Sequence, residues 1–395
     1  MPDSIFDVLI AGGGVMGSSV AYFLASSGRG QGLRIGVVEP DPSYATSSTA
    51  LSVGGIRQQF STEENIRLSL FGTRFFREAP RLLATEEEGP DLGFVENGYL
   101  LLASPEGLPI LQENHSLQVS LGARISLLSP EDLHHRFPWL HTSDLAGGGL
   151  GLNGEGWVDP YALLQAFRKK AISMGVQYVR DRIVGVEREG NRVEAVRLGG
   201  GHRLAAGALV NAAGPRAAEV AGMAGIHDLP VHPRKRFVYR FHCRERIPDA
   251  PLTVDPTGVY VRPEGPDFLC GVSPSPDQDP DTLDLEMAYD LFHQVIWPTL
   301  AHRIPAFQAL KLASSWAGHY AVNVRDRNAI LGPHPGLSNL YFVNGFSGHG
   351  LQHAPGVGRA ASELILFGEY RSVDLSRFAF RRFAAGALVQ ERNVV

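Results

Sequence analysis

The chain has 395 residues, too many for one ordinary hydrophobic core, so we expect two domains. Its formal net charge of −5 gives no argument for binding nucleic acid or an anionic membrane surface. With only Cys243 and Cys270 there is no disulfide framework and no cysteine spacing for zinc, and no apolar run approaches the length of a membrane span. We therefore expect a cytoplasmic protein without a metal, a membrane span or a nucleic-acid partner.

A glycine-rich turn lies in the first patterned stretch of the chain. Residues 8–11 form a short apolar run that predicts a buried strand, and Gly12, Gly14 and Gly17 follow in the spacing G-x-G-x-x-G. The first glycine permits a tight turn, and the second lets the backbone approach a pyrophosphate. The third lets the following helix pack closely on the strand. This spacing is typical of a dinucleotide-binding turn.

The continuation of this stretch strengthens the prediction. Val15 and Met16 begin the expected helix, whose N-terminus offers free N–H groups and a positive dipole to phosphates. Residues 35–38 are expected to form the next parallel strand, and Glu39 at its end is placed to accept hydrogen bonds from an adenosine ribose. The alternative is a βαβ unit with a purely structural role.

The loop after Glu39 is rich in small and hydroxyl residues. Ser48 and Thr49 lie in it, and Gly54-Gly55 allows close approach of backbone before Arg57. Such a composition indicates a loop beside a ligand, and not a packed helix.

Helices and strands alternate along the rest of the chain. Asp159 before Pro160 is a good N-cap for one of the helices. Helices are expected at residues 63–77, 105–121, 161–174, 283–297 and 355–367, with another beginning near 129. Strands are expected at residues 98–103, 176–179, 183–188, 193–198, 208–211, 236–241, 258–262, 268–271, 314–322, 329–332 and 340–344.

The two ends of the chain carry the nucleotide-binding patterns, whereas the middle stretches are typical of antiparallel sheet. The sequence therefore predicts discontinuous domains. The cofactor-binding domain is expected to comprise residues 1–88, 145–218 and 323–395, and the substrate domain residues 89–144 and 219–322.

Four stretches together resemble the flavin-dependent D-amino-acid oxidase/sarcosine oxidase/dimethylglycine dehydrogenase (DAO) family. They are the glycine turn with Glu39, the strand end 210–215, the strand 316–320 and the glycine-rich turn 345–350. The resemblance implies an α/β fold, with a Rossmann-like FAD-binding domain of the glutathione-reductase type and a mostly antiparallel α+β substrate domain. Residues 52–61 with 64–69 further resemble the branch that contains a mitochondrial flavoprotein linked to respiratory complex I assembly.

The resemblance makes the dinucleotide FAD. An NAD dehydrogenase has no need of a second glycine-rich helix start near the C-terminus, whereas an isoalloxazine ring needs a cradle. In such flavoproteins a helix N-terminus stabilises the charge that builds up at the N1–C2=O edge of the ring. The residues assigned to the ring are Gly345, Ser347, Gly348, His349, Gly350 and Leu351, and those assigned to the adenosine half are Val184, Ala213 and Gly214.

Non-covalent attachment of FAD is expected from two absences. Some relatives attach the flavin through a histidine in the loop after the second strand or through a cysteine near the strand 316–320. Residues 44–57 contain no histidine, and Ala317 stands about where that cysteine would be.

Members of this family oxidise amines by hydride transfer to flavin N5, which gives an imine that water hydrolyses. Glycine and D-amino-acid oxidases hold the substrate carboxylate with an arginine where this chain has Tyr320. Sarcosine oxidases use a lysine where it has Gln352. The best remaining cation is Arg57, which either contacts substrate or flavin or forms a plain salt bridge. We therefore expect an FAD-dependent oxidoreductase acting on a secondary amine or amino acid, with oxygen or a redox partner as electron acceptor.

Other candidates for the substrate side are Tyr260, His319 and His353, whereas His349 is expected to be mainly structural and Cys270 a buried thiol. Neutral histidine beside the amine suits proton transfer near pH 7. Two alternatives stay open: a 2-hydroxy-acid dehydrogenase of the same fold, and a flavoprotein acting mainly as an assembly or electron-transfer partner.

Overall fold

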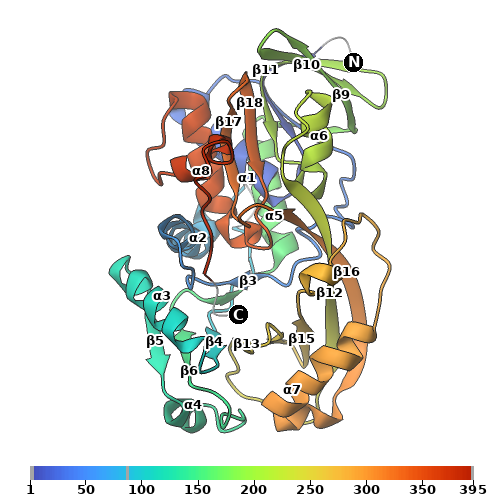
Figure 1. Cartoon of the computed structure of the whole chain (residues 1–395). Coiled ribbons are helices and arrows are strands. Elements are labelled where there is room, and N and C mark those ends of the chain that lie inside the picture. The colour runs from blue at the N-terminus through green and yellow to red at the C-terminus, as the bar shows by residue number, and fades with distance from the viewer. Residues whose placement is uncertain (1–3, 86–88, 393–395) are drawn as a thin grey trace.

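Two mixed sheets divide the chain into two domains, one above the other in Figure 1. The computed structural model describes residues 4–85 and 89–392. Within these residues each large sheet has eight strands, and a two-stranded ribbon lies between them. No helix of the described residues is long and apolar enough to cross a membrane.

The first sheet is largely parallel. β1, β2, β8, β11 and β18 run parallel, β17 pairs antiparallel with β18, and the β9–β10 pair continues antiparallel from β11. The bounds are β1 (Ser4–Ala11), β2 (Ile35–Glu39), β8 (Gln177–Arg180), β9 (Ile183–Glu189), β10 (Arg192–Leu198), β11 (Arg203–Asn211), β17 (Ile330–His334) and β18 (Leu337–Asn344).

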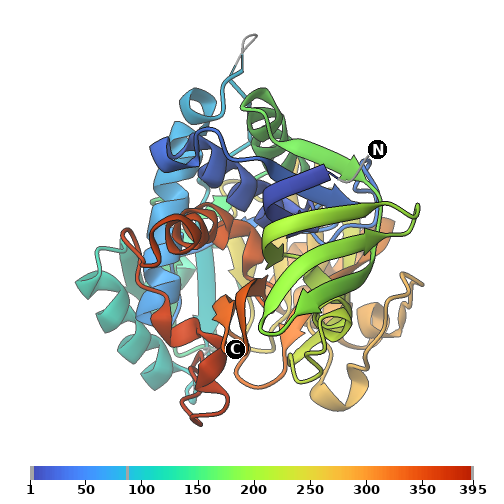
Figure 2. The same ribbon diagram turned by 90° about the horizontal axis from the view of Figure 1, so that it is seen from above.

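Both faces of this sheet are covered, as parallel sheets require. Side chains of a strand alternate between faces, so Val8 and Ile10 pack on one side and Leu9 and Ala11 on the other. The first side holds α1 (Val15–Ser26), α5 (Pro160–Ser173) and α8 (Gly350–Phe367), and the second holds β9, β10 and α6 (Ala217–Met223). Figure 2 shows α8 in red and the green β9–β10 pair toward opposite sides of the molecule.

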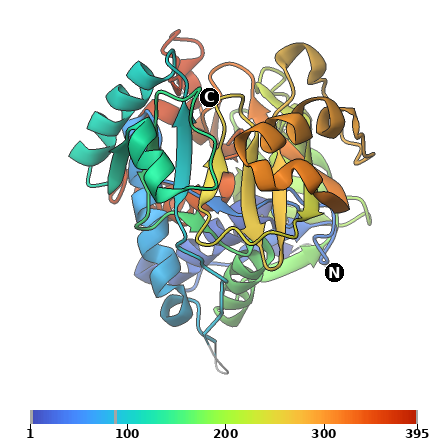
Figure 3. The same ribbon diagram turned by 90° about the horizontal axis from the view of Figure 1, so that it is seen from below.

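The second sheet is antiparallel except where β13 runs parallel to β4. α3 (Leu108–Ser120), α4 (Pro130–Arg136) and α7 (Trp297–Arg303) lie over it, and Figure 3 shows these teal and orange helices in front of the strands. The bounds are β4 (Tyr99–Ala103), β5 (Ile125–Leu128), β6 (Gly147–Gly151), β12 (Val231–His242), β13 (Leu252–Val254), β14 (Tyr260–Glu264), β15 (Asp267–Gly271) and β16 (Lys311–Asn323).

The remaining elements connect the domains or close turns. α2 (Glu63–Leu82) packs on α8, and β3 (Gly55–Ile56) pairs with β7 (Gly156–Trp157). Short 3-10 helices are η1 (Gly28–Gly30), η2 (Gly214–Arg216), η3 (Pro276–Gln278), η5 (Pro305–Ala309), η6 (Ser376–Phe378) and η7 (Phe380–Arg382), and η4 (Phe292–Ile296) is a π-helix.

The fold class is confirmed, but the first half of the helix expected at 283–297 is wrong. Residues 282–289 are irregular, and helical structure begins only at residue 290. The reason is electrostatic: Asp281 pairs with Arg234 at 3.1 Å and Asp284 with Lys235 at 2.6 Å, which lays this segment along β12. An exposed pair contributes little alone, but several along one strand hold a segment extended.

The path between the sheets differs from the predicted boundaries in two places. β6 falls inside the expected 145–218 segment, yet it hydrogen-bonds to β4 and β5 of the second sheet. α6 extends past residue 218, yet Val220 and Ala221 pack in the core of the first sheet. The pairing of β6 and the packing of α6 therefore shift, by several residues, the points at which the chain passes from one domain to the other.

Candidate functional site

A cavity of about 460 Å³ runs along the carboxyl ends of β1, β2 and β11, which we call the dinucleotide cavity. Ligands bind at this edge in open α/β sheets because the loops that follow the strands converge there. Of the residues assigned to the cofactor, those lining it are Gly12, Gly14, Val15, Met16, Glu39, Ser48, Thr49, Ala213, Gly214, Ser347, Gly348, Gly350 and Leu351.

The glycine turn has the geometry that its spacing predicts. Gly12 has φ +98°, and a side chain there would place Cβ 2.6 Å from the carbonyl oxygen of Ala212. Gly17 does not line the cavity; its missing Cβ would lie 1.9 Å from the carbonyl oxygen of Gly12. The two glycines therefore set the turn, while Gly14 faces the cavity with only Thr49 beside it.

Polar groups around this turn fit the cofactor. The Gly13 N–H donates to Glu39 at 2.8 Å, and the Val15 N–H donates to the Thr49 hydroxyl at 3.2 Å. Burial raises the pKa of Glu39. The Ser48 hydroxyl is buried and has no hydrogen-bond partner among the described residues, although it lines the cavity. A buried polar group normally finds a partner, and a phosphate oxygen provides one.

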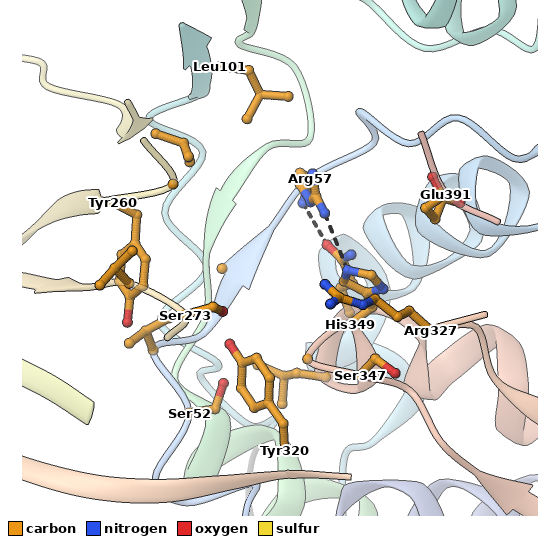
Figure 4. A pocket seen from close by; sticks show the side chains of 18 of the residues that line it. Ser52, Arg57, Leu101, Tyr260, Ser273, Tyr320, Arg327, Ser347, His349 and Glu391 are labelled. Atoms are coloured by element: carbon orange, nitrogen blue, oxygen red, sulfur yellow. Dashed lines mark hydrogen bonds between the residues drawn. The ribbon is translucent and has the colours of Figure 1, made fainter. Parts of the chain in front are cut away.

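A second cavity of about 680 Å³ lies between the two sheets, and we call it the interdomain cavity. It is lined by Arg57, Tyr99, Tyr260 and Gln352, among others, and Figure 4 shows it from close by. The two cavities meet, since they share the lining residues Ser52, Tyr320, Ser347, Gly348 and Leu351.

The turn before α8 lies where the cavities meet. Ser347 has φ 51° and Gly348 has φ +101°, both in the left-handed region, and a Cβ on Gly348 would lie 2.4 Å from the Tyr320 ring. No side chain caps α8, so its first N–H groups are open to a ligand. Gly345 shapes the turn from behind, with φ +71°, and lines neither cavity.

Arg57 is fixed at the wall of the interdomain cavity. Its backbone N–H donates to Gln352 Oε1 at 2.7 Å, and its guanidinium donates to the Gln59 carbonyl at 3.2 Å and lies 4.3 Å from the centre of the Phe60 ring. No carboxylate of the described residues forms an ion pair with it. The alternative that Arg57 only forms a structural salt bridge therefore has no support among the described residues.

His349 lies beside that guanidinium. Arg57 Nη2 is 3.4 Å from His349 Nε2, so this nitrogen accepts and the ring proton is on Nδ1. Burial, with Arg57 and Arg327 nearby, lowers the pKa of His349 to about 3. The imidazole is therefore neutral at pH 7.

Two other histidines lie apart from the interdomain cavity. His353 is buried, contacts the Ser69 hydroxyl at 3.1 Å and lines neither cavity. His319 lines the dinucleotide cavity, where its Nε2–H donates to the Asp284 carbonyl at 3.0 Å, and burial lowers its pKa. Both were predicted to lie near the substrate, because the sequence does not show the direction in which a side chain points.

Three phenols line the interdomain cavity: Tyr99, Tyr260 and Tyr320. Burial raises the pKa of each, so all three are neutral and can donate hydrogen bonds. Sequence reasoning missed Tyr99 and Arg327. Tyr99 lies in an ordinary apolar strand and Arg327 in a charged turn, so neither carries a distinguishing pattern.

Two other residues named from the sequence, Val184 and Cys270, line neither cavity. Val184 is 51% exposed and lines neither cavity, whereas Arg182 and Ile183 line the dinucleotide cavity. The assignment was one residue off along a strand whose faces alternate. Cys270 is buried in the second core, and burial raises the pKa of its thiol.

Glu155 is a buried acid behind Arg57 that the sequence did not single out. It is 0% exposed and accepts hydrogen bonds from the Gln58 backbone N–H at 2.5 Å and from Gln59 Nε2 at 2.8 Å. Burial raises the pKa of Glu155 to about 7, against the opposing effect of these bonds and of Arg57. It therefore fixes the two residues that follow Arg57.

We expect Glu155→Gln to flatten the pH dependence of stability between about pH 5 and pH 7. Between the ordinary carboxyl pKa of 4.5 and the folded value of about 7, the folded protein binds one more proton than the unfolded chain. Stability therefore falls as pH rises through this window, by about 3 kcal/mol in all. Melting temperatures of the wild type and the variant at stepped pH values measure the difference.

Glu96→Gln is the matched control, because Arg77 holds the pKa of that carboxyl low. It should leave the fall between pH 5 and pH 7 in place, because a group that titrates only at lower pH does not change its protonation in this range. Equal slopes in the wild type and Glu155→Gln would contradict the assignment.

The comparisons with known proteins fit this geometry. The family model for FAD-dependent oxidoreductases, DAO, matches residues 7–364. The chain therefore belongs to the DAO family of FAD-dependent oxidoreductases.

The similarity to relatives covers nearly the whole chain. It is 42% identical to "FAD-dependent oxidoreductase domain-containing protein 1" of Xenopus laevis, over 100% of this chain and 86% of that protein. It is 26% identical to the glycine oxidase of Geobacillus kaustophilus, over 95% of this chain and 97% of the other. Among solved structures, the L-proline dehydrogenase of P. horikoshii superposes with a TM-score of 0.87 at 26% identity, over 98% of this chain and 100% of that one.

Proposed function

We propose that this protein oxidises the C–N bond of a secondary amine or amino acid whose carboxylate is held by Arg57. The observation that carries the proposal is an arginine that has no carboxylate partner in the described part of the chain and lies in a cavity adjoining the glycine turn of α8. Similarity to a glycine oxidase and an L-proline dehydrogenase supports an amino acid as substrate. The carbon beside nitrogen loses a hydride, nitrogen loses a proton, and water hydrolyses the resulting imine.

The residues of the dinucleotide cavity would hold FAD. The turn from Gly12 with the Ser48 hydroxyl suits the pyrophosphate, Glu39 the ribose, and the turn 347–351 the flavin ring. FAD supplies the hydride acceptor, and the protein supplies the orientation of the substrate.

The side chains of the interdomain cavity orient the substrate. Arg57 binds the carboxylate by charge-assisted hydrogen bonds, and Gln352 fixes the backbone of Arg57. The neutral phenols of Tyr99, Tyr260 and Tyr320 donate to substrate oxygens, since burial raises the pKa of each. His349 accepts from Arg57 and keeps the guanidinium turned toward the cavity.

An anaerobic screen tests the proposal. Purified holoenzyme is mixed with secondary amines and amino acids and, in parallel, with the matching 2-hydroxy acids, while the visible absorption of the flavin is followed. Bleaching by an amine supports the proposal, and bleaching only by hydroxy acids assigns the protein to the second activity. If nothing bleaches the flavin and a partner protein co-purifies, the protein acts mainly in assembly or electron transfer.

We expect acid or heat to release all the flavin from purified protein, because we propose that FAD is bound without a covalent link. Both cysteines lie outside the dinucleotide cavity, and the buried Ala317 replaces a possible attachment point. Fluorescence that stays with the precipitated polypeptide would contradict this. A free-FAD sample treated in the same way is the control.

A further inference from the structure

We propose, on the basis of the function proposed above, that the substrate carries two carboxylates, one bound by Arg57 and the other by Arg327. Both arginines line the interdomain cavity. Figure 4 shows them on the same side of it, near His349 and opposite Tyr260. A cavity of about 680 Å³ has room for a substrate larger than glycine.

Neither Arg327 nor Arg57 has a carboxylate partner among the described residues. The Arg327 guanidinium has no hydrogen bond, ion pair or ring contact with the described residues, whereas its backbone N–H donates to the Asn323 carbonyl at 2.9 Å. It also lies close enough to His349 to help lower the pKa of that ring. Two arginines that form no ion pair with a described residue, beside one cavity, offer two positions for anionic groups.

The turn that carries Arg327 is held from several sides. Arg327 itself has φ 59°, an uncommon conformation for a residue with a side chain. Asp326 forms an ion pair with Arg382 at 2.7 Å, and Asn328 donates to the Val389 carbonyl at 2.8 Å. A backbone held in this way presents Arg327 to the cavity without further ordering on binding.

The described carboxylates that line the cavity form no ion pair with Arg57 or Arg327 and so leave both arginines available to a substrate. Asp326 is neutralised by Arg382. Glu391 accepts from the Ser61 N–H at 2.7 Å and from Asn65 Nδ2 at 2.6 Å, and forms no ion pair with a described residue. Among the described residues, Glu391 is thus one unpaired carboxylate in this wall against the two arginines Arg57 and Arg327, so the wall keeps excess positive charge.

Apolar side chains of the same cavity fit the carbon skeleton of the substrate. Leu101, Leu252 and Val254 line the cavity, from β4 and β13. A substrate held by two carboxylates thus presents its carbons to these apolar side chains. This arrangement distinguishes a dicarboxylic amine from one with a single acidic group.

Ligand binding tests the inference without turnover. Oxidised holoenzyme is titrated with propionate, succinate and glutarate, and the perturbation of the flavin spectrum gives each affinity. We expect the better dicarboxylate to bind about ten- to a hundredfold more tightly than propionate, as one more charge-assisted bond implies. Arg327→Gln should reduce the affinity for that dicarboxylate to the level of propionate and leave propionate unchanged.

Arg67→Gln is the control. Arg67 lies on the exposed side of α2, 2.7 Å from Glu63, and lines neither cavity. The variant removes the same charge far from the proposed site, so it should retain the preference for two carboxylates. Equal affinities in the wild type, or equal losses in both variants, would overturn the role of Arg327.

A kinetic comparison separates this inference from the proposed function. N-(carboxymethyl)glycine and N-methylglycine share the reacting amine and differ by one carboxylate. We expect Arg327→Gln to lower kcat/KM for the first alone, about tenfold or more. Oxidation of both amines with no effect of the variant would overturn the inference and keep the proposed function. Tight dicarboxylate binding lost in Arg327→Gln, with no amine oxidised, would overturn the function and keep the two-carboxylate site.

Discussion

Replacing Arg57 with alanine is expected to lower kcat/KM for an amine substrate ten- to a hundredfold, while the flavin content hardly changes. The guanidinium lies in the interdomain cavity without a carboxylate partner among residues 4–85 and 89–392, and it is held by the Gln59 carbonyl and the Phe60 ring. A charge-assisted bond to a substrate carboxylate is worth about 1.5–3 kcal/mol, which corresponds to this loss. Steady-state kinetics and the ratio of flavin to protein measure both quantities.

Arg67→Ala is the control for the loss of one positive charge. Arg67 lies on the exposed side of α2, 2.7 Å from Glu63 one turn away, and such a pair contributes little. It should leave kcat/KM and flavin content unchanged. If Arg57→Ala instead loses flavin and has normal kinetics once reconstituted, Arg57 belongs to the cofactor.

Replacing Gly17 with alanine is expected to abolish most flavin binding and to lower the melting temperature. The new Cβ would lie 1.9 Å from the carbonyl oxygen of Gly12 and 3.2 Å from a methyl group of Ile10. A backbone atom cannot move aside as a flexible side chain does, so the helix must shift away from the strand. That shift opens the turn whose N–H groups are expected to face the pyrophosphate.

Gly28→Ala is the matched control for this substitution. Gly28 follows the same helix, and no heavy atom lies within 4 Å of the place where its Cβ would be. The variant should keep the full ratio of flavin to protein and the wild-type melting temperature. A Gly17→Ala protein with unchanged flavin content and melting temperature would show that the turn tolerates a side chain.

Local patterns predicted the glycine turn and a helix cap of the first domain, for physical reasons. The spacing of Gly12, Gly14 and Gly17 follows from backbone contacts within a few residues, and the turn has that geometry. Asp159 caps α5 through its own side chain, which accepts from the N–H groups of Tyr161 and Ala162. Caps and tight turns depend on near neighbours, so the sequence shows them directly.

Prediction was wrong where distant residues decide the local structure. The helix expected at 283–297 begins late because Asp281 and Asp284 pair with β12, nearly fifty residues earlier in the chain. β6 left its expected domain because it pairs with β4 and β5. Periodicity in a short window does not show which strand or which charge will lie opposite.

The sequence by itself predicted the class of protein, which the family match confirms, and the spacing of the first glycine turn, and it singled out Arg57 as a candidate cation for the substrate. Only the tertiary structure decided which side chains share a cavity. It brought Tyr99, Tyr260 and Arg327 to Arg57, and it turned His353 toward Ser69. The physical reason is that a glycine turn is fixed by backbone sterics within one loop. A cavity between two sheets is fixed by packing among segments hundreds of residues apart.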